Sequence, residues 1–137
     1  MTDTIVPEGF EPHFRKSPVT DPWEPLFSRQ KDGVLEIGLR IAEAHCNARG
    51  FLHGGVMASL CDNAMGLTYG LNLDTKGSVV TLSLSVDYVA TAPIGAWMTV
   101  MPRLIRAGRS MGFVDAIVTA DETVVARASA TFRNLTG

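Results

Sequence analysis

The sequence has no surplus of positive charge and little cysteine. Its 137 residues carry a formal net charge of -2 at pH 7, whereas a general nucleic-acid-binding protein usually presents a basic face. We therefore expect no nucleic-acid partner. The two cysteines, Cys46 and Cys61, are too few for a disulfide framework, and they indicate a compartment in which thiols stay reduced.

Membrane, targeting and nucleotide-binding signals are missing as well. No stretch approaches the roughly 18 consecutive apolar residues of a membrane span, and the N-terminus lacks the basic-plus-apolar pattern of a secretory signal. These absences predict a cytoplasmic protein with no membrane partner. The sequence also contains no G-x-S-x-G, P-loop or G-x-G-x-x-G motif, which are common signatures of serine hydrolases and nucleotide-binding proteins.

The composition is that of one folded domain with an N-terminal arm. The chain is 46% hydrophobic and 19% charged, a balance typical of globular proteins. Residues 1–33 hold five of the seven prolines and show little periodicity, so we predict an arm laid over a domain formed by residues 34–137. Within the arm, Asp21 as an N-cap and Pro22 in the first turn favour a short helix. That helix would dock Trp23, Leu26 and Phe27 on the domain.

Alternation of apolar and polar residues predicts five strands in the domain. They are expected at about residues 35–41, 79–89, 97–106, 112–120 and 123–133. In the second strand, one face would carry Val80, Leu82, Leu84, Val86 and Tyr88, and the other Thr81, Ser83, Ser85 and Asp87. In the last strand, the inner face would carry Val124, Ala126, Ala128, Ala130 and Phe132. Pro102 indicates an edge position or a bulge in the third strand.

One long helix is predicted at about residues 54–70, between the first two strands. Its residues are apolar on nearly all sides, as expected of a buried helix. One buried helix and about five strands that mostly follow one another in the chain predict an α+β fold. In such a fold an antiparallel sheet curls around the helix.

The predicted start of this helix carries candidate functional groups. Gly54 and Gly55 allow backbone N–H groups to approach a ligand closely, and the first N–H groups of a helix have no partner within it. With the helix dipole behind them, they can polarise a carbonyl and stabilise an oxyanion. A plain tight turn is the alternative, and composition alone favours it. Asn47 and His53 can orient a substrate or water, or fix the loop.

Asp62 is the only charged residue of the predicted helix. Burial of a carboxylate costs several kcal/mol in order of magnitude unless it is paired or neutralised. Asp62 is therefore either a general base or a structural aspartate bonded to a nearby backbone group or to Asn63. It lies about 12 Å from Gly54 along the axis, at about 1.5 Å per residue. If both serve one reaction, a second copy must supply Asp62, as in an antiparallel helix pair about a two-fold axis.

Two further groups of polar residues are weaker candidates. The turn at residues 106–110 can hold a phosphate through N–H groups and guanidinium forks, or it is an ordinary solvated hairpin. The spacing of the potential metal ligands matches no zinc pattern, so we expect no metal site. Those residues are His45, Cys46, His53 and Cys61. Nothing in the sequence marks either cysteine as a reactive thiol.

The run Asn47-x-x-Gly50-x-x-His53-Gly54-Gly55, followed by Asp62-x-Ala64-x-Gly66, resembles the hot-dog-fold acyl-CoA thioesterases of the phenylacetate-pathway (PaaI) type. The segment from Val80-Thr81 to Asp87-Tyr88, then Pro93 and Gly95, and the turn Gly108-Arg109-Ser110 are also similar. The resemblance covers about residues 34–134. It implies an antiparallel sheet of five to six strands wrapped around one long central helix. It also implies subunits that pair into one continuous sheet and assemble as a homotetramer.

The resemblance further implies the reaction and the roles of the residues. The reaction is hydrolysis of an acyl-CoA thioester to free acid and CoA, with no cofactor because CoA belongs to the substrate and product. Gly54 would supply the oxyanion N–H, His53 would support the thioester, and Asn47 would position substrate or water. Asp62 of the partner subunit would be general base or nucleophile, and Thr81 would help to hold the water. The substrate-binding residues would be Gly55 and, for the CoA phosphates, Arg106, Gly108, Arg109 and Ser110.

The sequence leaves the acyl group and two other functions open. The apolar residues Phe51, Met57, Met65, Leu67 and Tyr69 can line a pocket for an aryl or medium-length aliphatic chain, or they belong to the core. An enoyl-CoA hydratase is the lesser alternative, because no Asp-x-Asn-Pro motif occurs. A noncatalytic acyl-CoA-binding protein is the alternative from a different functional class.

Overall fold

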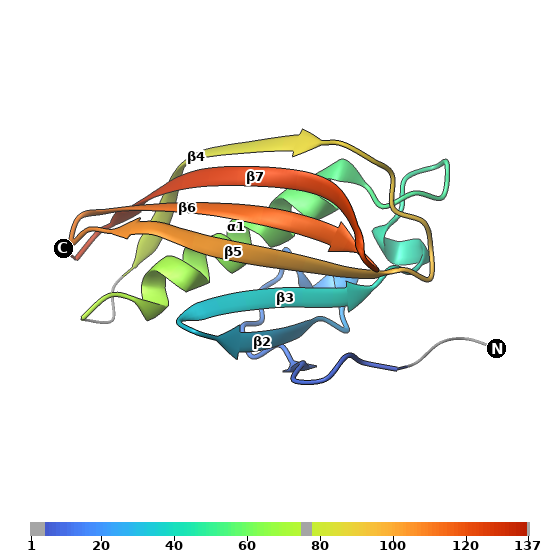
Figure 1. Ribbon diagram of the computed structural model, residues 1–137, viewed down its shortest axis with the longest axis horizontal. Helices are drawn as coiled ribbons and strands as arrows, with labels where there is room; N and C mark the ends of the chain where they lie inside the picture. Colours follow the sequence, from blue (N-terminus) through green and yellow to red (C-terminus); the bar gives the residue numbers. More distant parts are fainter. Residues whose placement is uncertain (1–4, 75–77, 137) are drawn as a thin grey trace.

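The computed structural model describes residues 5–74 and 78–136. Within these ranges, one α-helix, α1 (Gly54–Leu71), packs against one sheet whose neighbouring strands are all antiparallel (Figure 1). The strands are β1 (Glu11–Pro12), β2 (Phe27–Lys31), β3 (Val34–Arg40), β4 (Val79–Tyr88), β5 (Trp97–Ala107), β6 (Met111–Ala120) and β7 (Thr123–Asn134). Two short 3-10 helices are η1 (Asp21–Trp23) and η2 (Glu43–His45).

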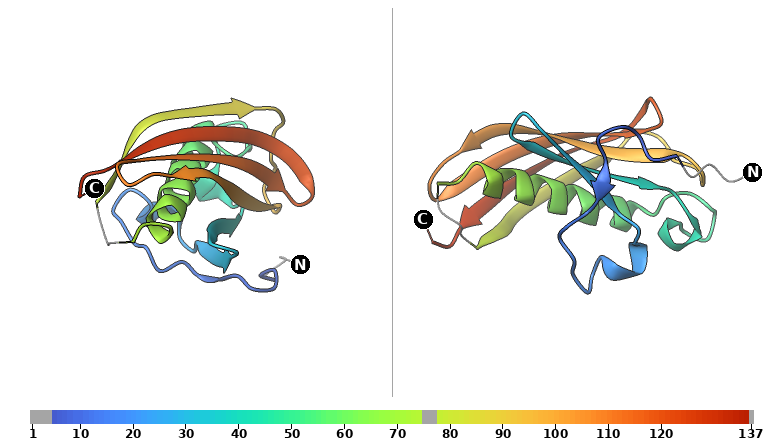
Figure 2. Two further views of the ribbon diagram at one scale, coloured as in Figure 1. Left: turned by 60° about the vertical axis from the view of Figure 1, so that its left-hand side comes forward. Right: turned by 90° about the horizontal axis from the view of Figure 1, so that it is seen from below.

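The predicted α+β arrangement is confirmed. The sheet has the order β1-β2-β3-β5-β6-β7-β4 and curves around α1, as the left view of Figure 2 shows. The residues of α1 that face the sheet are fully buried, among them Leu60, Ala64 and Met65. Burial of a side chain such as Leu60 or Met65 stabilises the fold by about 1.5–3 kcal/mol. The helix is therefore the centre of the core.

The strand count is higher than the five to six expected. In the part of the chain that the structure describes, seven strands form the sheet. The two additional strands, β1 and β2, come from residues 1–33, which were expected to be an arm. All five residues of β2 pair with β3, from Phe27 opposite Gly38 to Lys31 opposite Val34.

The short helix expected in the arm is reduced to η1. Its N-cap is Thr20, and Asp21 is already helical, so the predicted N-cap is wrong by one residue. The helix ends early because Glu24 is extended, the conformation that a following proline favours. The expected docking is confirmed at Leu26, which is buried, and at Phe27, whose ring centroid lies 5.7 Å from that of Trp97.

The predicted inner face of β7 is right except at one position. Ala126, Ala128 and Phe132 are buried as expected, but Val125 is buried in place of Val124. The cause is a change of pairing register between β6 and β7 at Val118, because a one-residue slip sends each following side chain to the other face.

Pro102 lies where β5 has a free edge, as predicted. The pairing of β5 with β3 covers only Trp97–Val100. Beyond that range β5 pairs with β6 alone. Proline is tolerated at such a position because it has no N–H to donate to a neighbouring strand.

Strand β4 is an edge strand with exposed apolar side chains. It pairs with β7 on one side, and Leu82 and Tyr88 remain 53% and 51% exposed. A single copy of the chain therefore leaves apolar side chains of this strand partly uncovered. No helix among the described residues is long and apolar enough to cross a membrane.

Candidate active site

The loop before α1 is held by the side chain of Asn47. Its Oδ1 accepts hydrogen bonds from the N–H groups of Arg49 at 2.9 Å and Phe51 at 3.3 Å. Gly50 has a φ of +84°, a backbone conformation that glycine adopts without strain. Asn47 thus fixes the loop, one of the two roles that its position in the sequence allowed.

His53 is the N-cap of α1. Its Nδ1 accepts a hydrogen bond from the N–H of Gly55 at 2.8 Å. A neutral imidazole that accepts through Nδ1 carries its proton on Nε2. Because the side chain is exposed, the Nε2–H group can donate to a bound carbonyl.

Gly54 presents its N–H at the first position of the helix. Among the described residues no group accepts a hydrogen bond from this N–H, whereas the Gly54 carbonyl accepts one from the Tyr88 hydroxyl at 2.6 Å. A Cβ at position 54 would lie 3.1 Å from Cζ of Tyr88, a contact that a small shift of the Tyr88 ring would relieve. The N–H of Gly54, the positive end of the helix dipole and Nε2–H of His53 are groups that can bind an oxyanion.

Asp62 is paired with Thr81. The Thr81 hydroxyl donates to Oδ1 of Asp62 at 2.6 Å. Asp62 is half-buried, so the expected loss of hydration is only partial. Burial raises the pKa of the neighbouring Cys61 thiol to about 12, and the Asp62 carboxylate adds to the effect. Cys61 therefore stays a neutral thiol near neutral pH and is a poor nucleophile.

The predicted face of Thr81 is wrong. A β-bulge between Thr81 and Ser83 changes the register of β4 against β7. Thr81 lies opposite the buried Phe132, and Val80 lies opposite the exposed Arg133. Thr81 therefore shares the inner face of the sheet with the residues opposite buried alanines of β7, such as Leu84, and it reaches α1.

Asp62 and Thr81 open on a groove of about 650 Å³. Helix α1 forms one wall, β4 and β7 form the other, and the N-terminal arm contributes the rest. The lining residues are Phe14, Arg15, Asp62, Asn63, Gly66, Leu67, Gly70, Leu71, Ser78, Val79, Thr81 and Phe132. Of the residues proposed for an apolar pocket, Leu67 is in this lining, while Met57, Met65 and Tyr69 belong to the core.

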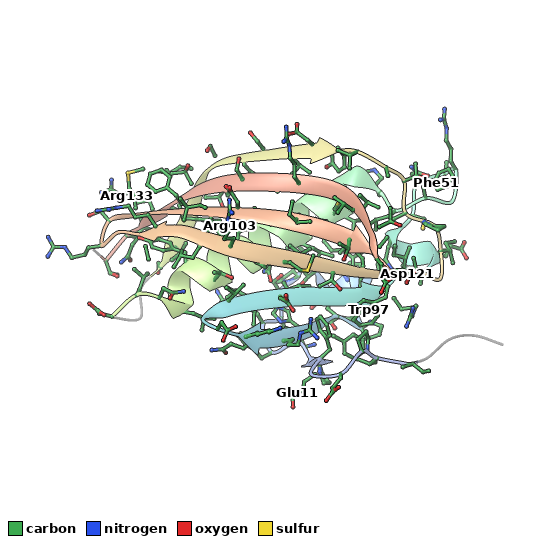
Figure 3. The ribbon with its side chains drawn as sticks, viewed as in Figure 1. Glu11, Phe51, Trp97, Arg103, Asp121 and Arg133 are labelled. Carbon is green, nitrogen blue, oxygen red and sulfur yellow. The ribbon has the colours of Figure 1, made fainter. Side chains whose placement is uncertain are left out.

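A single chain keeps the two groups of candidate residues apart. His53, Gly54 and Gly55 lie at the start of α1, and Asp62 with Thr81 lies about 12 Å further along the helix, at about 1.5 Å per residue. The loop with Phe51 is at one end of the molecule, as Figure 3 shows. The structure thus keeps these two groups of candidate residues separate within one chain.

The turn at residues 108–110 lies at the other end of α1, in Figure 1 near the C-terminus. Its carbonyl groups are held by side chains: Tyr69 donates to Gly108 at 2.7 Å, and Asn134 donates to Arg109 at 3.0 Å. A Cβ at Gly108 would lie 2.7 Å from the carbonyl oxygen of Met111. The side chains of Arg106 and Arg109 are exposed and can bind an anion from solution.

His45 has a structural role. It is buried, its Nδ1 accepts from the N–H of Ala42, and its Nε2 bonds with the carbonyl of Trp23. Within residues 5–74 and 78–136, no group of three or more His, Cys, Asp or Glu residues is arranged to hold a metal ion.

Sequence reasoning missed three contributors to these sites. The alternation places Tyr88 on the apolar face of a strand and gives no indication that it reaches the start of α1. Phe14 and Arg15 lie in an aperiodic segment without any motif, and only the folded chain brings them to the groove.

Comparison with known proteins shows which sequence family the chain matches. Residues 49–127 match the sequence family described as the Thioesterase superfamily. The chain is 38% identical to Putative esterase PA0474 of Pseudomonas aeruginosa over 93% of this chain and 96% of that protein. It is 28% identical to human Acyl-coenzyme A thioesterase 13 over 66% of this chain and 64% of that protein.

Solved structures support the fold. The BH2602 protein of Bacillus halodurans, determined with CoA, has a TM-score of 0.72 and 28% identity, covering 79% of this chain and 72% of its own. A mutant of the phenylacetic acid degradation protein PaaI of Thermus thermophilus has a TM-score of 0.76 and 22% identity. That match covers 87% of this chain and 100% of the other. The expected hot-dog fold is confirmed.

Proposed function

Because this chain belongs to the Thioesterase superfamily and is a thioester hydrolase, we propose that its substrates are acyl-CoA thioesters. The observation that carries the proposal is the Thr81–Asp62 pair, 2.6 Å apart, on the wall of a groove of about 650 Å³. A carboxylate beside a groove that is partly lined by apolar side chains is suited to act on a carbonyl whose acyl chain lies in that groove. The similar BH2602 structure, which contains CoA, supports CoA as the leaving group.

Each active site is formed by two copies of the chain. The N–H of Gly54 and Nε2–H of His53 in one copy receive the thioester oxygen. Asp62 of the partner subunit acts either as the base that takes a proton from a water attacking the carbonyl carbon, or as the nucleophile that attacks this carbon, in which case water then hydrolyses the acyl-Asp62 anhydride to the free acid. The oxyanion that develops is stabilised at Gly54, the C–S bond breaks, and CoA leaves as a thiol after it takes up a proton.

Thr81 orients the carboxylate in this scheme. Its hydroxyl donates to Oδ1 of Asp62, which leaves Oδ2 for the water or the carbonyl carbon. Arg106 and Arg109, with the turn glycine Gly108 and Ser110, receive the CoA phosphates. An aryl or medium-length acyl chain suits the size and lining of the groove.

The exposed edge of β4 supports the shared site. Edge strands expose unpaired N–H and C=O groups and are templates for a second strand. Antiparallel pairing of two β4 edges about a two-fold axis would cover Leu82 and Tyr88 and set two α1 helices side by side. Further assembly to a homotetramer and location in the cytoplasm stay predictions.

The test is an assay of hydrolysis on a panel of acyl-CoA thioesters. Release of the free CoA thiol measures the rate. We expect Asp62→Asn to abolish turnover, because the amide is neither base nor nucleophile, while the Kd for CoA stays unchanged. Asp115→Asn is the matched control: Asp115 pairs with Arg103 on an exposed surface and should leave turnover intact. Binding of acyl-CoA by the wild type without turnover would instead identify a noncatalytic binder. Water addition to an enoyl-CoA would identify a hydratase.

A further inference from the structure

The N-terminal arm reaches the groove beside Asp62. We infer that Arg15 and Phe14 determine which acyl groups this protein accepts, and that Arg15 favours acyl chains ending in a carboxylate. The inference rests on the proposed function, since it concerns the acyl end of the same substrate. It assigns a role in specificity to a segment that lies outside the region matching the family.

The arm is fixed where it crosses α1. Strand β1 pairs with β2, and the N–H of His13 donates to the carbonyl of Leu26 at 2.9 Å. The His13 ring is 1% exposed, and its Nε2 bonds with Oδ1 of Asn63 at 3.1 Å. The right view of Figure 2 shows this N-terminal segment crossing the helix on the side away from the sheet.

This anchor holds the next two residues at the groove. Asn63 is the neighbour of Asp62 on α1, and Phe14 follows His13 with its ring centroid 5.1 Å from the imidazole. Both Phe14 and Arg15 line the groove that Asp62 and Thr81 line. The arm therefore places an aromatic ring and a guanidinium in the same space as the candidate catalytic carboxylate.

The lining of the groove suits a chain with an apolar body and an anionic end. Its apolar part is formed by Leu67, Leu71, Val79 and Phe132. A Cβ at Gly70 would meet no atom within 4 Å, so there is room along the helix. This part can cover the methylene groups of an acyl chain.

Arg15 supplies the group that would recognise the end of the chain. Among the described residues that line the groove, it alone carries a positive charge. No carboxylate in the described part of the chain forms an ion pair with it. A guanidinium binds a carboxylate through two parallel hydrogen bonds, which are stronger than bonds between neutral groups.

Phe14 supplies apolar surface at the same rim. Its side chain is 63% exposed, so a bound chain would cover a ring that otherwise faces water. Such burial favours acyl groups with enough apolar surface to cover the ring over an acetyl group.

The test compares substrates that differ only at the far end of the acyl group. Adipyl-CoA and hexanoyl-CoA both carry six-carbon chains, but only adipyl-CoA ends in a carboxylate. We expect Arg15→Gln to lower kcat/KM for adipyl-CoA about tenfold or more, and to change it less than about twofold for hexanoyl-CoA. Lys16→Gln is the matched control. It removes the same charge from the next residue, which pairs with Glu24 and does not line the groove, and it should change neither value.

Phe14→Ala gives an independent readout. It should raise KM for both six-carbon substrates and leave KM for acetyl-CoA unchanged. A uniform loss for all substrates in Arg15→Gln, with weaker binding of free CoA, would place Arg15 on the CoA phosphates and overturn the inference. Equal values for wild type and Arg15→Gln would also overturn it. Neither result touches the proposed function, which fails only if the wild type hydrolyses no acyl-CoA.

Discussion

Gly54 has two backbone groups with different environments. Its carbonyl accepts a hydrogen bond from Tyr88 at 2.6 Å, and its N–H is without an acceptor in the described part of the chain. The N–H shares its peptide group with the His53 carbonyl, which accepts a hydrogen bond from the N–H of Met57 at 3.1 Å, and this bond fixes the orientation of the unpaired N–H at the start of the helix. Such a fixed donor is what stabilisation of an oxyanion requires, because no reorganisation is needed during the reaction.

A comparison of Gly54→Ala with Gly54→Pro distinguishes the effect of losing this N–H from the effect of the added Cβ on packing. Both substitutions add the Cβ that lies 3.1 Å from Tyr88, but only proline removes the N–H. Proline suits the first position of a helix, and His53 already has the extended conformation that precedes proline, with φ -68° and ψ 132°.

We expect kcat of Gly54→Pro to be about 100-fold below that of Gly54→Ala, the size of effect seen when one oxyanion donor is lost. Steady-state kinetics measure the difference, and thermal melting shows whether the two variants are equally folded. Equal kcat values in equally stable variants would remove Gly54 from the site.

Thr81 shows where residue-level prediction fails. The alternation of β4 is unbroken in the sequence, so Thr81 was assigned to the polar face. The bulge between Thr81 and Ser83 arises in the pairing with β7. No residue of the local sequence predicts it. A bulge adds one residue to one strand and reverses the faces on one side of it, which here gives Asp62 its hydrogen-bond partner.

At the scale of elements, the structure of the arm was the part of the fold that the sequence predicted least well. The predicted boundary of the arm follows residue 33, but Asp32 and Gly33 form a turn between β2 and β3, with φ of 53° and 76°. Asp-Gly between two strands is a hairpin signal. Read as such, it predicts β2. The position of β1 and the contact of His13 with Asn63 have no comparable signal, because they depend on tertiary packing.

His13 makes the arm sensitive to acid. Its Nδ1 is buried and has no hydrogen-bond partner among the described residues. Burial lowers the pKa of His13 below its ordinary value of 6.5; Lys16 and Arg15 lower it further, while the bond to Asn63 and the charge of Glu24 act in the opposite direction. Just below pH 6.5 the unfolded chain therefore binds a proton that the folded chain does not. The free energy of unfolding must then decrease as the pH falls through this range.

We expect the wild type to lose more stability between pH 7.5 and pH 5.5 than His13→Gln, because glutamine does not titrate. Urea unfolding at both pH values gives the two differences in the free energy of unfolding. His45 and His53 are present in both proteins and serve as the internal reference. Parallel losses in the two proteins would show that His13 does not control the stability of the arm.

At the scale of the whole molecule, the sequence predicted that Gly54 and Asp62 lie too far apart to serve one reaction within a single chain. The length of α1 between Gly54 and Asp62 was enough to separate the two groups, and the structure keeps them apart on one chain. The apolar residues of β4 were correctly identified, but their exposure depends on the place of β4 at the edge of the sheet. A single sequence does not reveal that place, because it follows from the pairing order.

A shared site has a consequence that no single-chain site has. Gly54→Pro damages one part of the site and Asp62→Asn the other. In a dimer of one copy of each, one site receives both defects, and the other combines an intact Gly54 with an intact Asp62. Each homodimer of a variant has a defect in every site, so only mixed dimers can be active.

We expect the two inactive variants, mixed in equal amounts, unfolded and refolded together, to recover about one quarter of the wild-type activity. Random pairing makes half of the dimers mixed, and one of the two sites in each mixed dimer is intact. Different affinity tags on the two variants allow the mixed dimer to be isolated, and each variant refolded alone is the control. If Gly54 and Asp62 acted within one chain, every site in the mixture would carry a defect, and activity would stay at the level of the controls.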